Sequence, residues 1–300
     1  MTDPSTDATD ATDATDRPRL PTGVIENLGG RDVHWLEIGG DEPPVLLLGG
    51  CGVQYTLWDF VVETLRDEHH VRTVLMDRPG MAGSRWPGRL PLLAEEVDTL
   101  VAIIERIGRP TVVVGHSMAG PHGEALVRRR PDLVAGLVLL DGSNEWRPRP
   151  SRFETAWLRA ARTAHASMGV APLQALAVWA DRMMIGAQST RTKVALMPPW
   201  AGWAYRDPEA VAMVIAEQAA YGRQLADLDA LRAEGDWPDV PTVVVTGAAG
   251  DNAGWAEDQA RYARMLDAEH VVLPDSRHMI MLDRPDAVVD AVLRLRDRAG

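Results

Sequence analysis

The chain has 300 residues, of which 46% are hydrophobic and 25% charged, an ordinary composition for a globular protein. Its formal net charge of −12 argues against nucleic-acid binding, because phosphate backbones are bound by clustered Lys and Arg. Cys51 is the single cysteine, so no internal disulfide can form. No apolar run reaches the roughly 18 residues of a membrane span. We therefore expect a cytoplasmic protein that binds neither nucleic acid nor membrane.

Residues 1–20 differ from the rest of the chain. They consist largely of Ala-Thr-Asp repeats, are acidic and contain no aromatic residue. They also lack the basic start and the apolar segment of a secretory signal. Such a composition cannot bury enough apolar surface to offset the entropy of ordering. We predict a disordered acidic tail.

Short aliphatic runs bounded by Gly, Pro or Asp follow the tail, and helical patterns lie between them. Runs of this kind are typical of strands covered on both faces in a parallel sheet. The alternation of strand and helix predicts an α/β protein with a doubly wound sheet. The predicted strands are 33–38, 45–48, 71–76, 111–114, 137–140, 242–245 and 270–273. The predicted helices are 57–66, 92–107, 121–130, 256–266 and 285–295.

The alternation stops at residues 143–237, where the pattern is mostly helical. This segment is rich in Trp and Met, and two interpretations stay open: its large side chains form a core of their own, or some of them line an apolar pocket beneath a cap. The side chains concerned are Trp157, Trp179, Met183, Met184, Met197, Trp200, Trp203 and Tyr205. Pro198, Pro199 and Gly202 predict a loop within the segment.

The strongest local motif is Gly-His-Ser-Met-Ala-Gly at 115–120, directly after a predicted strand and before a predicted helix. A serine on a sharp strand-to-helix turn is exposed at the edge of the sheet, and its neighbours two residues away must be small. Gly115 and Ala119 meet that requirement. Ser117 is therefore the candidate nucleophile.

Three further segments occur in the order typical of one family. They are Leu-Leu-Leu-Gly-Gly-Cys-Gly at 46–52, Asp-Arg-Pro-Gly-Met-Ala-Gly-Ser at 77–84 and Pro-Asp-Leu-Val at 131–134. Together with the serine turn, they resemble the α/β-hydrolase superfamily, in its branch of capped esterases and C–C hydrolases. The resemblance implies an α/β-hydrolase fold, with a mostly parallel doubly wound sheet formed by residues 21–142 and 238–300. It also implies an inserted helical cap at 143–237.

The same resemblance implies an oxyanion hole made of two backbone N–H groups. They would belong to Cys51 and Met118. Gly49 stands where the family commonly has His, so Gly52 is an alternative donor in the first turn. The Cys51 side chain is expected to matter less than its backbone, and a merely buried cysteine is an equal alternative.

A serine hydroxyl needs a base, and eight histidines compete for that role. His278 follows the last predicted strand and precedes Asp283 and Pro285, an arrangement that resembles the family's His-containing ending. We predict that His278 is the base. The base in turn needs a carboxylate to orient it. In the family's usual chain order this is Asp251, after the strand at 242–245, and Asp141, after the preceding strand, is the alternative.

These residues predict a serine hydrolase that cleaves a small apolar ester-like molecule through an acyl-enzyme. The Ser, His and Asp side chains with two backbone donors need no metal and no organic cofactor, and the chain has no phosphate-binding loop, dinucleotide fingerprint or zinc motif. A C–C hydrolase, a lactonase and an acyl-transferring tailoring enzyme of the same fold stay open, as does a ligand receptor without turnover. The sequence leaves the oligomeric state, including a homo-oligomer, undetermined.

Overall fold

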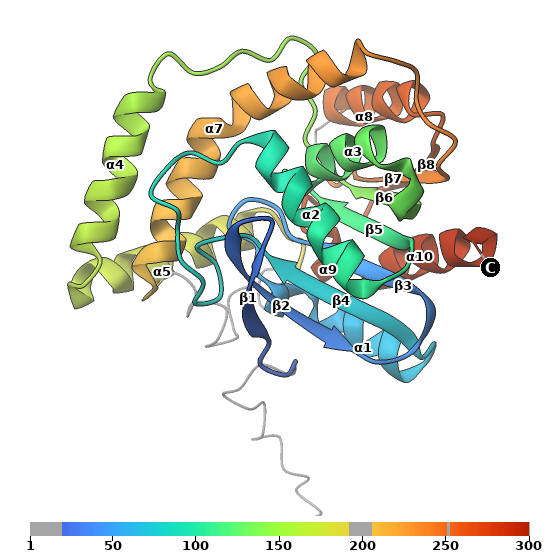
Figure 1. The fold of residues 1–300 in the computed structure, drawn as a ribbon, viewed down its shortest axis with the longest axis horizontal. Helices are drawn as coiled ribbons and strands as arrows, with labels where there is room; N and C mark the ends of the chain where they lie inside the picture. The colour runs from blue at the N-terminus through green and yellow to red at the C-terminus, as the bar shows by residue number, and fades with distance from the viewer. Residues whose placement is uncertain (1–19, 192–205, 251–252, 300) are drawn as a thin grey trace, which may run out of the picture.

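An eight-stranded sheet forms the centre of the molecule in the computed structural model, which describes residues 20–191, 206–250 and 253–299 (Figure 1). Its strand order is β1-β2-β4-β3-β5-β6-β7-β8. The pairs β1·β2 and β2·β4 are antiparallel, and the other pairs are parallel. The strands are β1 (Val24–Leu28), β2 (Arg31–Ile38), β3 (Asp41–Leu48), β4 (Val71–Asp77), β5 (Thr111–His116), β6 (Val134–Leu140), β7 (Thr242–Gly247) and β8 (Glu269–Leu273).

Both faces of this sheet are buried, as the aliphatic runs predicted. Alternate residues of one strand enter different clusters: Val45 and Leu47 pack on one face, and Leu46 and Leu48 on the other. The first face is covered by α1 (Asp59–Asp67) and α10 (Pro285–Ala299). The second is covered by α2 (Leu93–Ile107), α3 (Ala119–Arg129) and α8 (Ala253–Met265). The doubly wound, mostly parallel architecture is thus confirmed.

The strand β1 was not predicted from the sequence. It is an edge strand whose Val24 and Ile25 are exposed, so it lacks a buried aliphatic run. A signal was nevertheless present, because Gly29 and Gly30 both adopt positive φ in the tight turn to β2. A Gly-Gly pair between two short strands is a hairpin signature.

The inserted segment contributes three described helices, α4 (Glu154–Ser167), α5 (Ala171–Ala187) and α7 (Pro208–Arg232). α7 begins sharply because Asp207 accepts a hydrogen bond from the N–H of Glu209 and Pro208 occupies the first turn. α4 packs along α7 through small side chains such as Ala161 and Ala216, and both helices extend beyond the sheet (Figure 1). The helical character predicted for this segment is confirmed for these parts.

The large side chains of the inserted segment are more exposed than either interpretation expected. Trp179 is 60% exposed and Trp157 47% exposed, and Met183 and Met184 are exposed as well. These four therefore form neither a core nor the wall of a closed pocket. The others named in the sequence, Met197, Trp200, Trp203 and Tyr205, lie outside the described residues, as does the predicted loop around Pro198, Pro199 and Gly202.

The N-terminal boundary shifts by one residue. Leu20 was assigned to the tail, but its side chain is 5% exposed and packs in the core cluster that contains α1. Residues 1–19 lie outside the described part of the chain. Among the helices that are described, none combines the length and the apolar character that crossing a membrane requires.

Candidate active site

Ser117 lies on the predicted sharp turn between β5 and α3. Its φ is +52°, a backbone conformation that non-glycine residues seldom adopt. A Cβ added at Gly115 would lie 2.6 Å from the carbonyl oxygen of Ala119, and one at Gly120 would lie 3.0 Å from the Cα of Gly142. These close approaches explain why small residues surround the serine. The turn holds Ser117 at the carboxyl end of the parallel strands.

His278 lies in the loop between β8 and the short helix α9 (Ile280–Asp283), as predicted. Its Nδ1 is 2.6 Å from Oδ2 of Asp141, which follows β6 directly. The other carboxylate oxygen of Asp141 accepts hydrogen bonds from the indole N–H of Trp255, at 2.7 Å, and from the backbone N–H of Gly247, at 3.2 Å. Asp141 is buried, so three donors fix its carboxylate in one orientation.

The nucleophile and this His–Asp pair share one edge of the sheet. The N–H of Ser117 donates to the carbonyl of Leu140, the residue before Asp141, at 3.0 Å. The ring of His116 lies 4.7 Å from the ring of His278, centroid to centroid. Among the described residues, the Ser117 hydroxyl makes no hydrogen bond to His278. Such contacts are often long before a substrate binds and shorten in the complex.

His116 supports the loop that carries His278. Its Nε2 lies 3.0 Å from the backbone carbonyl oxygen of His278, and because a carbonyl only accepts, Nε2 must carry the proton. Burial, together with the nearby His278, holds the pKa of His116 well below its usual range. His116 is therefore neutral near pH 7 and acts as a fixed donor rather than a second base.

The turn after β3 lies against the nucleophile. A Cβ added at Gly50 would be 2.7 Å from the Cβ of Ser117. Within the described part of the chain, neither the backbone N–H of Cys51 nor that of Met118 donates to another residue. The Cys51 thiol accepts from the side-chain amide of Gln218 at 3.2 Å. Burial, together with the Glu217 carboxylate, raises the pKa of this thiol, so it stays protonated.

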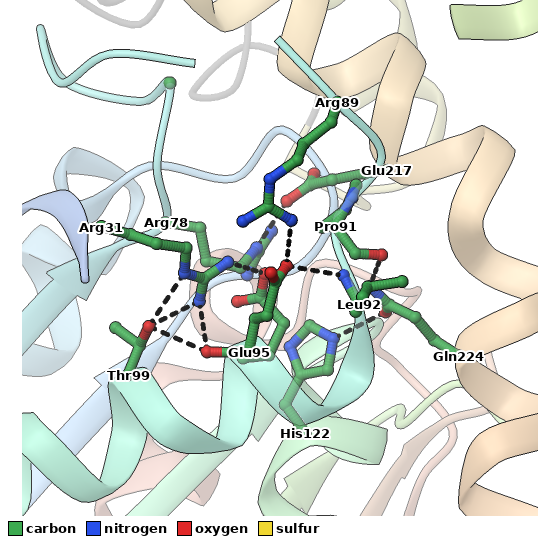
Figure 2. A network of polar contacts seen from close by, with 12 residues as sticks. Arg31, Arg78, Arg89, Pro91, Leu92, Glu95, Thr99, His122, Glu217 and Gln224 are labelled. Carbon is green, nitrogen blue, oxygen red and sulfur yellow. Dashed lines mark hydrogen bonds and ion pairs between the residues drawn. The ribbon is translucent and has the colours of Figure 1, made fainter. Parts of the chain in front are cut away.

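A buried arginine that sequence reasoning missed holds this turn. Arg78 donates from Nη2 to the carbonyl of Gly50 at 2.7 Å and from Nη1 to the carbonyl of Gly49. Its Nε is 2.5 Å from Oε1 of Glu217 on α7 (Figure 2). In the sequence, Arg78 stands within the family-typical segment at 77–84, where no role was predicted for it. The one available signal was a charged residue directly after a buried strand.

A family model matches the part of the chain that contains these residues. The model described as "Alpha/beta hydrolase family" matches residues 45–291, which include the serine turn, Asp141 and His278. The chain belongs to this family. The expectation from the sequence motifs is thus confirmed.

Relatives of this hydrolase span most of its length. It is 29% identical over 270 residues to the (E)-2-((N-methylformamido)methylene)succinate hydrolase of Acinetobacter baylyi, covering 87% of the chain and 93% of the relative. It is 25% identical over 295 residues to the esterase Rv0045c of Mycobacterium tuberculosis, covering 92% and 90%. A shorter match, 33% over 113 residues, covers 37% of the chain and 41% of a pimeloyl-[acyl-carrier protein] methyl ester esterase of Sodalis glossinidius.

Solved structures show the same fold. A thermophilic esterase from Thermogutta terrifontis superposes with a TM-score of 0.70 at 22% identity, covering 93% of the chain and 99% of that protein. An α/β-hydrolase fold protein from Burkholderia ambifaria gives 0.71 at 20% identity, covering 92% and 98%. At these identities, the likeness concerns the fold alone.

Of the two candidate acids, the structure describes Asp141 alone. Asp251, the preferred acid from chain order, lies outside the described residues. Asp141, the alternative, forms the 2.6 Å contact with Nδ1 of His278. That nitrogen offers one N–H, so a single carboxylate occupies it. The contact favours Asp141 over Asp251.

A cavity of about 410 Å³ borders the His–Asp pair of the hydrolase. Its walls mix the Trp255 indole with the polar side chains of Gln188 and Arg277, and Ser117 is not among its lining residues. Within the described ranges, no three His, Cys, Asp or Glu side chains are grouped closely enough to hold a metal ion.

Proposed function

We propose that this protein is a serine hydrolase that cleaves a small, neutral and largely apolar ester through an acyl-enzyme. Ser117 is the nucleophile, His278 the general base and Asp141 the acid that orients it. The observation that carries the proposal is the 2.6 Å contact between His278 and Asp141 at the edge of the sheet that presents Ser117. The sequence favoured Asp251 as the acid, and the proposal replaces it with Asp141.

The contact assigns the two nitrogens of His278. An ionised carboxylate only accepts, so the proton of a neutral His278 is on Nδ1 and Nε2 has its lone pair free. Nε2 then takes the proton of Ser117 Oγ as that oxygen attacks the ester carbonyl, and the resulting imidazolium faces the Asp141 carboxylate. His278 returns the proton to the leaving alcohol. Water, activated by His278, then cleaves the acyl-enzyme.

The attack places a negative charge on the former carbonyl oxygen. The unused N–H groups of Cys51 and Met118 flank Ser117, one in the turn after β3 and the other at the start of α3. The amino end of a helix also carries a partial positive charge, which favours an anion there. We assign the oxyanion hole to these two donors. No metal or organic cofactor enters the proposed reaction.

The charge of the buried arginine beside the turn is already paired within the protein. Arg78 is buried, paired with Glu217 and bonded to two carbonyls, so its charge is not available to a substrate carboxylate. Relatives point to carbonyl chemistry: two are esterases by name, and one is a hydrolase of a formamido succinate. The two esterase names favour an ester of modest size, and the pairing of Arg78 favours one without a carboxylate beside the turn, unlike the succinate of the third relative.

Hydrolysis of nitrophenyl esters with graded acyl lengths tests the proposal. The native chain should cleave the esters, Ser117→Ala should abolish cleavage, and Ser151→Ala, a change in the inserted segment, should leave the rate unchanged. The preferred acyl length then measures the acyl pocket. Cleavage that persists in Ser117→Ala would refute the proposed nucleophile.

Other outcomes separate the alternatives on the same fold. If the protein cleaved a lactone or a C–C bond and left esters intact, the proposed substrate would change to that class. Ser117 would remain the proposed nucleophile. Transfer of the acyl group to an added alcohol faster than to water would indicate a tailoring enzyme. Tight ligand binding without turnover of any of these substrates would indicate a receptor.

A further inference from the structure

The turn at residues 49–52 is held from both sides by groups outside it. Arg78 binds the carbonyls of Gly49 and Gly50. On the other side, Oε2 of Glu217 lies 3.4 Å from the N–H of Gly52, and the amide of Gln218 donates to the Cys51 thiol. Residues 217 and 218 follow each other on α7, so the inserted helix contacts the turn directly.

The carbonyl of Gly50 and the N–H of Cys51 belong to the same peptide unit. A trans peptide is planar, with its C=O and N–H pointing in opposite directions. When Arg78 binds the Gly50 oxygen at 2.7 Å, it therefore fixes the direction of the Cys51 N–H as well. The N–H of Val53 donates to the same oxygen at 3.0 Å, so Arg78 adds to a hydrogen bond within the turn. Because Gly50 is permissive at its backbone dihedrals, its peptide plane depends on these bonds.

Glu217 keeps Arg78 in place and charged. Burial by itself would lower the pKa of Arg78, but the Glu217 carboxylate more than offsets this and raises it. The Arg78 side chain is 6% exposed and that of Glu217 1% exposed, so removal of either charge leaves the other buried without its opposite charge. The planar guanidinium also binds three acceptors at once, which a lysine cannot do with the same geometry.

We propose that Arg78, fixed by Glu217 of the inserted helix α7, is a positioning residue that aims the Cys51 N–H at the oxyanion. This inference rests on the proposed function, because it presupposes the attack by Ser117. It makes stabilisation of the transition state depend on the docking of α7. Substrate binding before the attack does not depend on the same contact.

The test compares two buried arginines. Arg31 is as buried as Arg78, each 6% exposed, and pairs with Glu96 of α2 at 2.6 Å. Its other hydrogen bonds go to Thr99 and to the carbonyl of Glu95 (Figure 2), and none reaches the turn among the described residues. Arg78→Lys should lower kcat by about 10- to 1,000-fold with KM within about twofold, a loss comparable to that of an oxyanion donor. Arg31→Lys should leave kcat within about threefold, even if both variants lose thermal stability.

Glu217→Gln gives a second variant should Arg78→Lys not fold, since the amide keeps the size of the side chain and loses the charge. A trifluoromethyl ketone that forms a tetrahedral adduct with Ser117 reports the oxyanion hole directly. Its affinity should fall in proportion to kcat/KM in Arg78→Lys and Glu217→Gln, as transition-state analogues do. In Arg31→Lys its affinity should stay at the native value.

The two proposals fail in different ways. Ester cleavage that survives Ser117→Ala would remove the proposed function. Cleavage that requires Ser117, but falls equally in Arg78→Lys and Arg31→Lys or through KM alone, would overturn the positioning role and leave the function in place. Unchanged ketone affinity in Glu217→Gln would also overturn it.

Discussion

The two sides of the proposed active site are built from different parts of the chain. On the acid–base side, Ser117, Asp141 and His278 follow β5, β6 and β8. The loop of His278 is also bonded to the inserted segment, because the N–H of Met279 donates to the carbonyl of Gln188 at 2.9 Å. On the oxyanion side, the turn after β3 is held by Arg78 and by the inserted helix α7. The sheet has buried aliphatic side chains on both faces, whereas the inserted helices pack through a few alanines and methionines.

This difference separates the supports of the two sides of the proposed site. Ser117 and Asp141 have a rigid support, because β5 and β6 are hydrogen-bonded on both edges and packed on both faces, whereas β8, which leads to His278, is an edge strand. The oxyanion side depends on a contact between two segments that are separate in the sequence. Changes on α7 should therefore affect the oxyanion side first, and changes in β5 or β6 should affect Ser117 and Asp141 first.

The largest effect is expected from the acid. Asp141→Asn should lower kcat by about 10⁴-fold, since an amide that donates to His278 favours the wrong tautomer. Asp251→Asn should retain kcat within about threefold. Steady-state rates on the preferred nitrophenyl ester measure both variants. The reverse order of effects would return the acid to Asp251.

Gly50→Ala tests how closely the two sides meet. The new Cβ would lie 2.7 Å from the Cβ of Ser117, too close for both to stay in place. A displacement of the turn by a fraction of an ångström should lower kcat by about 100-fold. Gly39→Ala is the control, because a Cβ there meets no atom within 4 Å. Equal activity in the two variants would show that the turn is not held against the nucleophile.

Trp255→Phe should remove one of the two N–H groups that hold Oδ1 of Asp141. The ring is retained and the 2.7 Å bond to Asp141 is lost, while the N–H of Gly247 still holds the same oxygen. We expect kcat to fall by roughly 10-fold, as for the loss of one hydrogen bond to a charged group. Trp146→Phe is a matched control that removes a surface Trp–Asp bond, to Asp258 at 3.1 Å. An equal loss of kcat in both variants would show that Trp255 has no specific role at the site.

The smallest effect concerns stability at the contact between α3 and α7. His122 bonds Gln224 there at 2.9 Å, and burial lowers its pKa in the folded protein. Below the unfolded value of about 6.5, the unfolded chain binds a proton that folded His122 does not, so the free energy of unfolding falls as the pH drops. Denaturant unfolding at pH 7.5 and pH 5 should show a smaller drop in His122→Asn than in the native chain. Equal drops would contradict this.

Much of the acid–base side could be predicted from local sequence. Aliphatic runs predicted seven of the strands, because a strand buried on both faces needs apolar residues at every position. Small residues around Ser117 predicted the sharp turn, since only they allow the close approach of Gly115 to Ala119. The position of His278 after the last strand was likewise evident. The edge strand β1 was not predicted because it is largely exposed and has no buried aliphatic run.

The inserted segment was less predictable, because large apolar side chains on a helix do not reveal what covers them. Trp157 and Trp179 suggested a core or a pocket, but the structure leaves both exposed. Part of α7 packs through Ala210, Ala212 and Ala216, small side chains that give a weak signal in the sequence.

The sequence by itself determined the family, the doubly wound sheet, the serine turn and the loop of His278, because each depends on residues that are neighbours in the chain. Only the tertiary structure brought Asp141 to His278, since two strand-end loops both carry an aspartate and spacing alone does not say which one reaches the ring. It alone also revealed the pair of Arg78 and Glu217, which lie 139 residues apart. Contacts between distant segments follow from the packing of the whole fold, and no local pattern encodes them.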